Sequence, residues 1–443
     1  MFVRQLRLVT CGVCLCFVAV SQNEQQYTAK EQVQRIRDLG KKGAAAIPAL
    51  EQYLNDPNRE IRVEAVKAIV KIGTEASLAS LAKATHDSDS EVQIRATDGL
   101  TNYYLPGYVV KGGLTGPFTR GMRQAKVFFS SRNDQQINAD VTIRPDVSQA
   151  LADEVRGASS ADARANAARA AGILRDNAAV PALAEALHAK ESHVIFESLV
   201  ALQKIGNPSA CQALSSPAHD LDDRIQATAL ETIGVLHCAG CAPDVRSTVT
   251  NARNAKIRRA ALDALAMLAI PEDRSIFLKY VQDRDADLRT SALEGLGRIR
   301  EPEDTPAMKQ AYDEANADPK VHLAAAFALV DEGQVDLADF SPLSYLFENL
   351  EVKSRAATAQ AYLTELARRE DVRRTLFTLV NTATKDQKIA LCSIFAGAHN
   401  DDVMPTLNTL SKDIDSDVAV AASRALRQTQ ANRTSQSKLL PQN

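Results

Sequence analysis

The stretch DADLRTSALEGL, from Asp285 to Leu296, decides the fold of this chain. Its acidic start suits a helix N-terminus, because a short carboxylate side chain accepts hydrogen bonds from the free backbone N–H groups there. Ala292 and Gly295 follow three positions apart and therefore share one face of the helix. A face of small residues allows a second helix to approach closely. The stretch predicts a capped helix that packs tightly against a neighbour.

The same pattern of small and apolar residues recurs along the chain. It is seen as IRVEAVKAI (61–69), VQIRATDGL (92–100), ARANAARAA (163–171), VIFESLVAL (194–202), IRRAALDAL (257–265), LRTSALEGL (288–296), VHLAAAFAL (321–329) and VAVAASRAL (418–426). The first small residue of each unit marks the register: Ala65, Ala96, Ala167, Ser198, Ala227, Ala261, Ala292, Ala325, Thr358, Ala390 and Ala422. Consecutive members lie 29 to 34 residues apart, except for one gap of 71 between Ala96 and Ala167. Such a period indicates an array of structural repeats.

Each unit reads as a helical hairpin. An apolar helix such as IPALEQYL (47–54) comes first, and a short break containing Asp or Pro follows it. The second helix carries the small residues and often ends in Ile-Gly, as at Gly73, Gly206 and Gly234. Glycine there can adopt the left-handed conformation that stops a helix. Arginines early in the second helix (Arg62, Arg164, Arg258 and Arg289) are expected to bond to the preceding turn, with a row of ligand-binding arginines as the alternative.

Composition agrees with many small cores stacked in a row. Aromatic residues make up only 5% of the chain, and there is no Trp. No single hairpin can bury its apolar face alone, so each unit must stack on its neighbours. The sequence therefore predicts an all-α protein, an α-solenoid of about eleven stacked helical hairpins with one irregular insertion. A net charge of −3 gives the whole molecule no attraction to nucleic acid or anionic lipid.

The unit Asp-x-x-[hydrophobic]-Arg-x-x-Ala-x-x-Ala-Leu resembles the bacterial HEAT repeats of the phycobilisome-lyase type. The resemblance covers residues 44–426 and implies a HEAT-like superhelix, although the period is shorter than the usual 40–47. Among enzymes of related fold, deoxyhypusine hydroxylase binds iron through His-Glu pairs, and this sequence has no His-Glu dipeptide. A phycobilin lyase would act in the cytoplasm, which conflicts with the N-terminus described next.

The first 21 residues have the pattern of an export signal. Two arginines precede an apolar run from Leu8 to Val20, and the tripeptide AVS fits a cleavage site before Gln22. The 13-residue run is shorter than the roughly 20 residues of a membrane-spanning helix. We expect residues 1–21 to be a signal peptide and the mature protein to be periplasmic or secreted. The solenoid then spans residues 22–430, and residues 431–443 form a polar C-terminal tail.

An insertion at residues 104–146 interrupts the repeats. Its early part, 105–132, is rich in glycine and has five basic residues and no acidic one. The candidate partner-binding residues are Tyr108, Lys111, Phe118, Arg120, Arg123, Lys126, Phe128, Phe129 and Arg132. Three short runs, 109–110, 127–129 and 141–143, have the β-branched or aromatic composition of small strands.

Three interpretations of this insertion stay open. It folds over the solenoid and fills a groove with its aromatics, or it docks a protein partner. Alternatively its cations and aromatics contact an anionic surface, a membrane in preference to nucleic acid. Export makes nucleic acid the weakest of these partners.

The four cysteines outside the signal are Cys211, Cys238, Cys241 and Cys392. Cys238 and Cys241 form a Cys-x-x-Cys pair in a turn between helices and are a candidate disulfide, with two unpaired thiols as the alternative. Haem attachment would need His after the second cysteine, where Ala242 stands. The spacing fits no known zinc finger, and a thioredoxin-like motif would need a strand. Cys211 and Cys392 are expected to be buried as small apolar residues.

No catalytic motif stands out, and we expect no cofactor, metal or enzymatic activity. The predicted function is non-catalytic binding of a protein or peptide along the solenoid surface in the cell envelope, with the insertion as a second contact. The alternative is a lyase-type or repair-type HEAT-repeat enzyme with a concave pocket. An enzyme would gather convergent polar side chains in one cleft.

Overall fold

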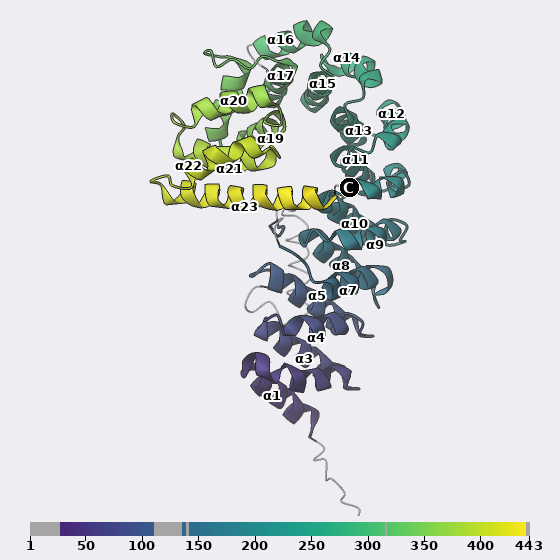
Figure 1. The fold of residues 1–443 in the computed structure, drawn as a ribbon. Coiled ribbons are helices and arrows are strands. Elements are labelled where there is room, and N and C mark those ends of the chain that lie inside the picture. The colour runs from purple at the N-terminus through teal and green to yellow at the C-terminus, as the bar shows by residue number, and fades with distance from the viewer. Residues whose placement is uncertain (1–26, 110–134, 139–140, 315–316, 440–443) are drawn as a thin grey trace, which may run out of the picture.

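The computed structural model describes residues 27–109, 135–138, 141–314 and 317–439, with side chains as far as Ala431. Every regular element in these residues is a helix, so the all-α prediction is confirmed. After an N-terminal helix, α1 (Ala29–Gly40), the described chain forms eleven helical hairpins. Each hairpin has an outer element and an inner helix, and the hairpins stack into a curved solenoid (Figure 1).

The inner helices carry the repeat motif. They are α3 (Arg59–Ile72), α5 (Ser90–Tyr104), α8 (Ala161–Ile173), α10 (Ser192–Ile205), α11 (Asp223–Val235), α13 (Ala255–Leu268), α15 (Ala286–Ile299), α17 (Pro319–Glu332), α19 (Ala356–Leu366), α21 (Lys385–Gly397) and α23 (Ser416–Leu439). The outer elements are α2 (Ile47–Glu51) with η2 (Gln52–Asn55), α4 (Ser77–Ala84), α7 (Pro145–Gly157), α9 (Val180–Ala186), η4 (Pro208–Ala213) with η5 (Pro217–His219), α12 (Ala242–Asn251), α14 (Arg274–Tyr280), α16 (Thr305–Asp313), α18 (Pro342–Glu348), α20 (Glu370–Leu379) and α22 (Met404–Leu410).

One repeat position is completely buried in every inner helix, and it marks the register. Eight predicted register residues occupy it, from Ala65 to Ala422, each 0% exposed. In three units the prediction is wrong by one or two positions. The buried residues there are Ala229, Ala359 and Leu391, in place of Ala227, Thr358 and Ala390. With these corrections, consecutive register residues lie 31 to 34 apart, again excepting the gap of 71 at the insertion.

The acidic breaks between helices work as paired caps. Asp285 accepts hydrogen bonds from the backbone N–H groups of Asp287 and Leu288 and so caps α15. Asp283, two residues earlier, accepts one from the backbone N–H of Asp285. The same two-step arrangement recurs at 87–89, 220–222 and 413–415. The predicted role of these breaks as helix starts is confirmed.

Two of the three named glycine stops are confirmed. Gly73 and Gly206 adopt left-handed conformations with φ of 60° and 74°. Gly234 does not, because α11 continues to Val235 and the left-handed residue is His237. At Gly234 the missing side chain allows close packing instead, since an added Cβ would lie 3.1 Å from the Cα of Ala264.

Arg62 bonds to the preceding inter-helix turn, as expected, whereas Arg164 and Arg258 bond to the last turn of the preceding outer helix. Arg62 donates to the carbonyl of Asp56, Arg164 to that of Val155 and Arg258 to that of Val249. Arg289 differs, because it pairs with Glu314 near the end of the next outer helix. These arginines hold the hairpins together and are not a row of free ligand-binding groups.

The stack curls back on itself in its C-terminal half. Figure 1 shows the inner helices lining the inside of the curve, with α23 crossing from the end of the stack towards α10. At 24 residues, α23 is about 36 Å long. It continues to Leu439, past residue 431, where the predicted polar tail begins. No residue before Tyr27 is described, and the predicted signal peptide lies outside the described residues.

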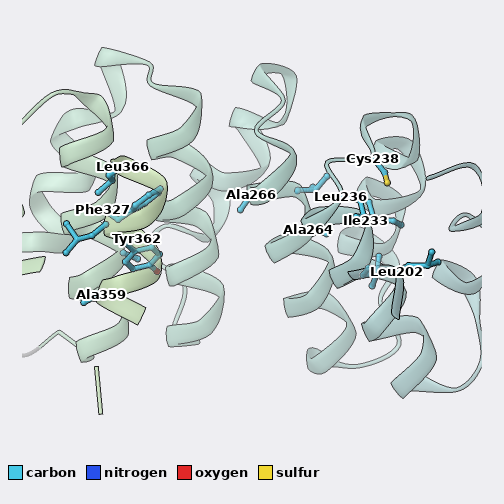
Figure 2. Packing of buried hydrophobic residues seen from close by; sticks show 14 of the residues in the cluster. Leu202, Ile233, Leu236, Cys238, Ala264, Ala266, Phe327, Ala359, Tyr362 and Leu366 are labelled. Atoms are coloured by element: carbon cyan, nitrogen blue, oxygen red, sulfur yellow. The ribbon is translucent and has the colours of Figure 1, made fainter. Parts of the chain in front are cut away.

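Two apolar clusters make up the core and meet at α7 and α8. One runs from Ile36 to Leu174 and the other from Ala152 to Ala425. Figure 2 shows the second cluster continuing from Leu202 and Ile233 to Phe327 and Tyr362, across several units. The core is therefore a continuous seam between neighbouring helices, as stacking requires.

A substitution at Gly297 would test the close packing of α15 against α17. An added Cβ would lie 2.5 Å from the Cα of Ala328 on α17, and a backbone atom cannot rotate away. We expect Gly297→Ala to lower the free energy of unfolding by about 1–3 kcal/mol, measured by urea titration with circular dichroism. Gly157→Ala is the control, because its added Cβ would meet no atom within 4 Å. Equal stability of the two variants would contradict the close approach of α15 and α17.

Candidate binding surfaces inside the curve

A polar network joins two inner helices that are not neighbours in the stack. Arg298 on α15 donates to both carboxylate oxygens of Glu365 on α19, at 2.7 and 2.9 Å. It also donates to Glu294, one turn earlier, at 3.1 Å. Its guanidinium lies 4.9 Å from the ring centre of Phe327 on the intervening helix α17. These contacts link α15 to α19 on the inside of the curve. Counting the hairpins from the N-terminus, they hold the seventh, eighth and ninth units in their curved arrangement.

The polar groups of this network form hydrogen bonds with one another. The Tyr362 hydroxyl donates to Glu294 at 2.5 Å, and burial together with that carboxylate raises the pKa of Tyr362 well above its ordinary value. Burial alone would raise the pKa of Glu365, but hydrogen bonds from Arg298 and its charge outweigh burial and lower that pKa. Each charged member thus has a partner inside the network, which is the arrangement of a structural clasp.

Beside the network, acidic side chains occupy one repeat position in three successive helices. Glu231, Asp263 and Glu294 each follow the register residue by two positions, on α11, α13 and α15. Glu231 and Asp263 are exposed to solvent on the inside of the curve, whereas Glu294 is tied to Arg298. We call these three residues the acidic row.

Asp263 has the most perturbed acidity of the row. It is accessible to solvent, yet surrounding protein limits its contact with bulk water, and this raises its pKa to about 6. The Ser291 hydroxyl donates to Asp263 and opposes the rise, while the charges of Glu294 and Glu231 add to it. Burial likewise raises the pKa of Glu231. A cationic group placed against the row would relieve this crowding of carboxylates.

The insertion begins and ends beside inner helices. The backbone N–H of Val109 donates to Asn102 near the end of α5, and that of Ile137 donates to the carbonyl of Ile173 at the end of α8. Tyr108 is half-buried and close enough to Arg169 to interact with it electrostatically. The other candidate residues, Lys111, Phe118, Arg120, Arg123, Lys126, Phe128, Phe129 and Arg132, lie outside the described residues.

The strand prediction for the insertion fails where the structure describes it. Residues 141–143 have no regular structure, and the backbone N–H of Val141 closes a turn onto Asn138. The other two runs, 109–110 and 127–129, lie wholly or partly outside the described residues.

The disulfide prediction is also wrong. Cys238 pairs with Cys211, and Cys241 remains a buried thiol that donates to the carbonyl of Cys211 at 3.7 Å. The two bonded cysteines are 27 residues apart, close to one repeat, because stacking lays η4 against η6 (Ala239–Cys241) of the next unit. Cys392 is 1% exposed, as expected, and burial raises the pKa of its thiol to about 11.

This disulfide holds an outer element that has no α-helix. In unit five two short 3-10 helices, η4 and η5, replace the α-helix found at this place in other units. Short 3-10 helices have poorer hydrogen-bond geometry than α-helices. The bond from Cys211 to Cys238 ties this element to the following unit.

Metal-binding geometry is not found in the part of the chain that the structure describes. No group of three or more His, Cys, Asp or Glu side chains there is placed to hold an ion. None of the described helices has the length and apolar composition needed to cross a lipid bilayer.

Residues 24–101, 148–234 and 242–330 match the family model described as HEAT repeats, which covers more than half of the chain. The chain belongs to the HEAT-repeat family. No curated protein matches it.

Two solved structures resemble this HEAT-repeat protein distantly. The complex of CpcE and CpcF of phycocyanin lyase from Nostoc sp. PCC7120 is 18% identical, with 58% of this chain and 88% of that chain covered at a TM-score of 0.34. The crystal structure of an engineered protein is 17% identical, with 90% and 99% covered at a TM-score of 0.30. At these scores neither likeness bears on function.

Asp263 makes the stability of the protein depend on pH. With its pKa raised to about 6, the folded state binds this proton more readily than the unfolded chain, so stability falls as pH rises from about 4 to about 6. Asp263→Asn keeps a hydrogen-bond acceptor for Ser291 but cannot ionise. We expect the variant to be more stable at pH 7 by about 1 kcal/mol, a value discounted for solvent access, and to match the native chain near pH 4.

The measurement is a series of thermal melts between pH 4 and pH 7. Glu303→Gln is the control, because this side chain is 79% exposed on the outer surface. A gain for Asp263→Asn that stayed constant across the pH range would show that ionisation of Asp263 is not its cause.

Loss of the disulfide should destabilise the solenoid. Closing a loop of this length is worth about 3–4 kcal/mol in the chain-entropy model. We expect Cys211→Ser to lower the melting temperature in non-reducing buffer and to make it insensitive to dithiothreitol. Cys241→Ser should leave both the melting temperature and its sensitivity to reduction close to native. Alkylation of Cys211 in unreduced, denatured protein, read by mass spectrometry, would refute this pairing.

Proposed function

We propose that this HEAT-repeat protein is a non-catalytic binding protein of the cell envelope, which holds a protein or peptide partner inside its curve. The observation that carries the proposal is the contrast between two groups of charges there. In the Arg298 network the charged side chains pair with one another, whereas the side chains of Glu231 and Asp263 are exposed to solvent. Accessible carboxylates with raised pKa values favour a partner segment with Lys or Arg side chains.

The insertion is the proposed second contact. Its described ends lie beside α5 and α8, at the ends of inner helices and next to the same concave surface. Its cations and aromatics, Lys111 to Arg132, suit an acidic protein surface or a membrane surface. A partner with a basic segment and a separate acidic patch would engage both.

Export to the periplasm or beyond is part of the proposal. The apolar run from Leu8 to Val20 supports it, and so does the bond between Cys211 and Cys238, because disulfides persist mainly in oxidising compartments. Mature protein from a cell-envelope fraction should begin at Gln22. Intact Met1 on protein recovered from the cytoplasm would contradict it.

An enzyme of the lyase or repair type is the second candidate. It is favoured by Asp263, whose pKa of about 6 suits proton transfer near neutral pH. The network beside Asp263 is the kind of convergent polar cluster that an enzyme needs. Its internal pairing supports binding over catalysis, because a catalytic group must be free to meet substrate.

The binding proposal is tested with purified variants immobilised and exposed to envelope extract. Glu231→Gln/Asp263→Asn removes the accessible acids of the row and should weaken partner affinity by about tenfold or more. Glu272→Gln/Glu303→Gln removes two exposed acids from outer elements and should bind as the native chain does. Binding should also weaken as salt is raised.

A deletion of residues 110–132 examines the second contact. We expect reduced recovery of the same partner, with the helical circular-dichroism signal of the solenoid retained. Equal recovery by the native chain, the acidic-row variant and the deletion would refute the proposed concave binding surface.

A further inference from the structure

A second polar site lies where the curled end of the stack meets its earlier part. Helix α23 crosses towards α10, with the segment that precedes α7 beneath it (Figure 1). Helix α23, this segment and the turn after α8 line an open cavity of about 180 Å³. Its lining is Gln136, Ile137, Asn138, Arg175, Arg424, Arg427 and Gln428. Residues from the third and the eleventh unit thus meet at one place.

The described part of the lining is positively charged. Among the residues that the structure describes, it holds three arginines and no acidic residue. Arg424 and Arg427 lie three positions apart, so both project from one face of α23. No described carboxylate pairs with Arg175, Arg424 or Arg427, although ion pairs to Asp or Glu recur elsewhere along the stack, such as Arg373 with Asp402 and Arg274 with Asp304.

The backbone conformation of Arg175 is shared by the equivalent residue of most units. Arg175 is left-handed, with φ of 51°, as are Gly73 and Gly206, but also Ala269 and Arg300, at the same repeat position. A residue with a side chain is strained there and glycine is not. At the corresponding place after α15, Arg300 uses its side chain to pair with Asp331 at 2.8 Å. Arg175 has no such protein partner among the described residues and instead lines the cavity.

The positive charge extends beyond the lining. Burial, and then the charges of Arg368 and Arg175, lower the pKa of His399 at the end of α21. Like charges gathered in one place repel each other. An anion between the arginines would remove the repulsion and join α23 to the turn after α8.

The chemistry and size of the cavity select the kind of anion. Guanidinium groups bind phosphate and sulfate oxygens with paired, charge-assisted hydrogen bonds, and Gln136, Asn138 and Gln428 supply further amide donors. The volume of about 180 Å³ exceeds what one water requires but is below the 300–1,000 Å³ of pockets for larger ligands. We propose that this cavity is a binding site for a small tetrahedral oxyanion, phosphate or sulfate, free in solution. The site is separate from the acidic row and does not depend on the proposed function.

The test is calorimetric titration of the native protein with inorganic phosphate at constant ionic strength. Saturable binding to one site is expected, with sulfate competing and acetate binding far more weakly. Arg424→Gln/Arg427→Gln should weaken phosphate binding by about tenfold or more. The matched control, Arg284→Gln/Arg374→Gln, removes two exposed arginines elsewhere and should bind as the native protein does.

Arg175→Gly separates a ligand-binding role from a structural one. Glycine adopts φ of 51° without strain, so this variant should be at least as stable as the native protein while phosphate binding weakens. Binding unaffected by either arginine variant, or no saturable phosphate heat with the native protein, would overturn the proposal. Acetate binding as tightly as phosphate would also overturn it, because the site would then select carboxylates.

Discussion

The fold depends on the close approach of successive inner helices at one completely buried position. A few positions after it, the two backbones come so near that Gly297 has no room for a Cβ beside Ala328. This contact repeats with a spacing of 31 to 34 residues and sets the distance between units. Large aromatic side chains would hold the helices apart, which accounts for their scarcity in the chain. Each hairpin is stable only because the next one covers it.

The helix caps also link neighbouring units. Asp89 caps α5 and accepts a charged hydrogen bond from Arg59 of the unit before it. Asp285 caps α15 and pairs with Arg259 in the same way. Exposed ion pairs of this kind contribute little one at a time, but here each also orients a cap. Starting a helix and attaching it to the previous hairpin therefore rest on the same carboxylate.

Local pattern was enough to predict the class of fold, the number of hairpins and most of the register. It failed at Ala229 and Ala359, because their helices carry several small residues and only packing selects the buried one, and at Leu391, where a large residue takes the place of the small one. The pairing of Cys211 could not be predicted locally, because its bonded partner Cys238 lies nearly one full unit away in sequence. The Arg298 network and the arginine cavity depend on how tightly the stack curls, and curvature accumulates from small rotations that no single motif encodes. The insertion had a distinctive composition, but composition does not say what it touches.

The ion pair between Arg298 and Glu365 distinguishes this protein from a solenoid whose units contact only their immediate neighbours. A simple solenoid behaves as a line, in which each unit feels only the two beside it. Here unit seven also holds unit nine directly, and the last helix reaches the third unit. These contacts join units that are not neighbours in the stack. A disturbance at one hairpin can then travel by two routes, and opposite sides of the curve respond together to whatever occupies the space between them.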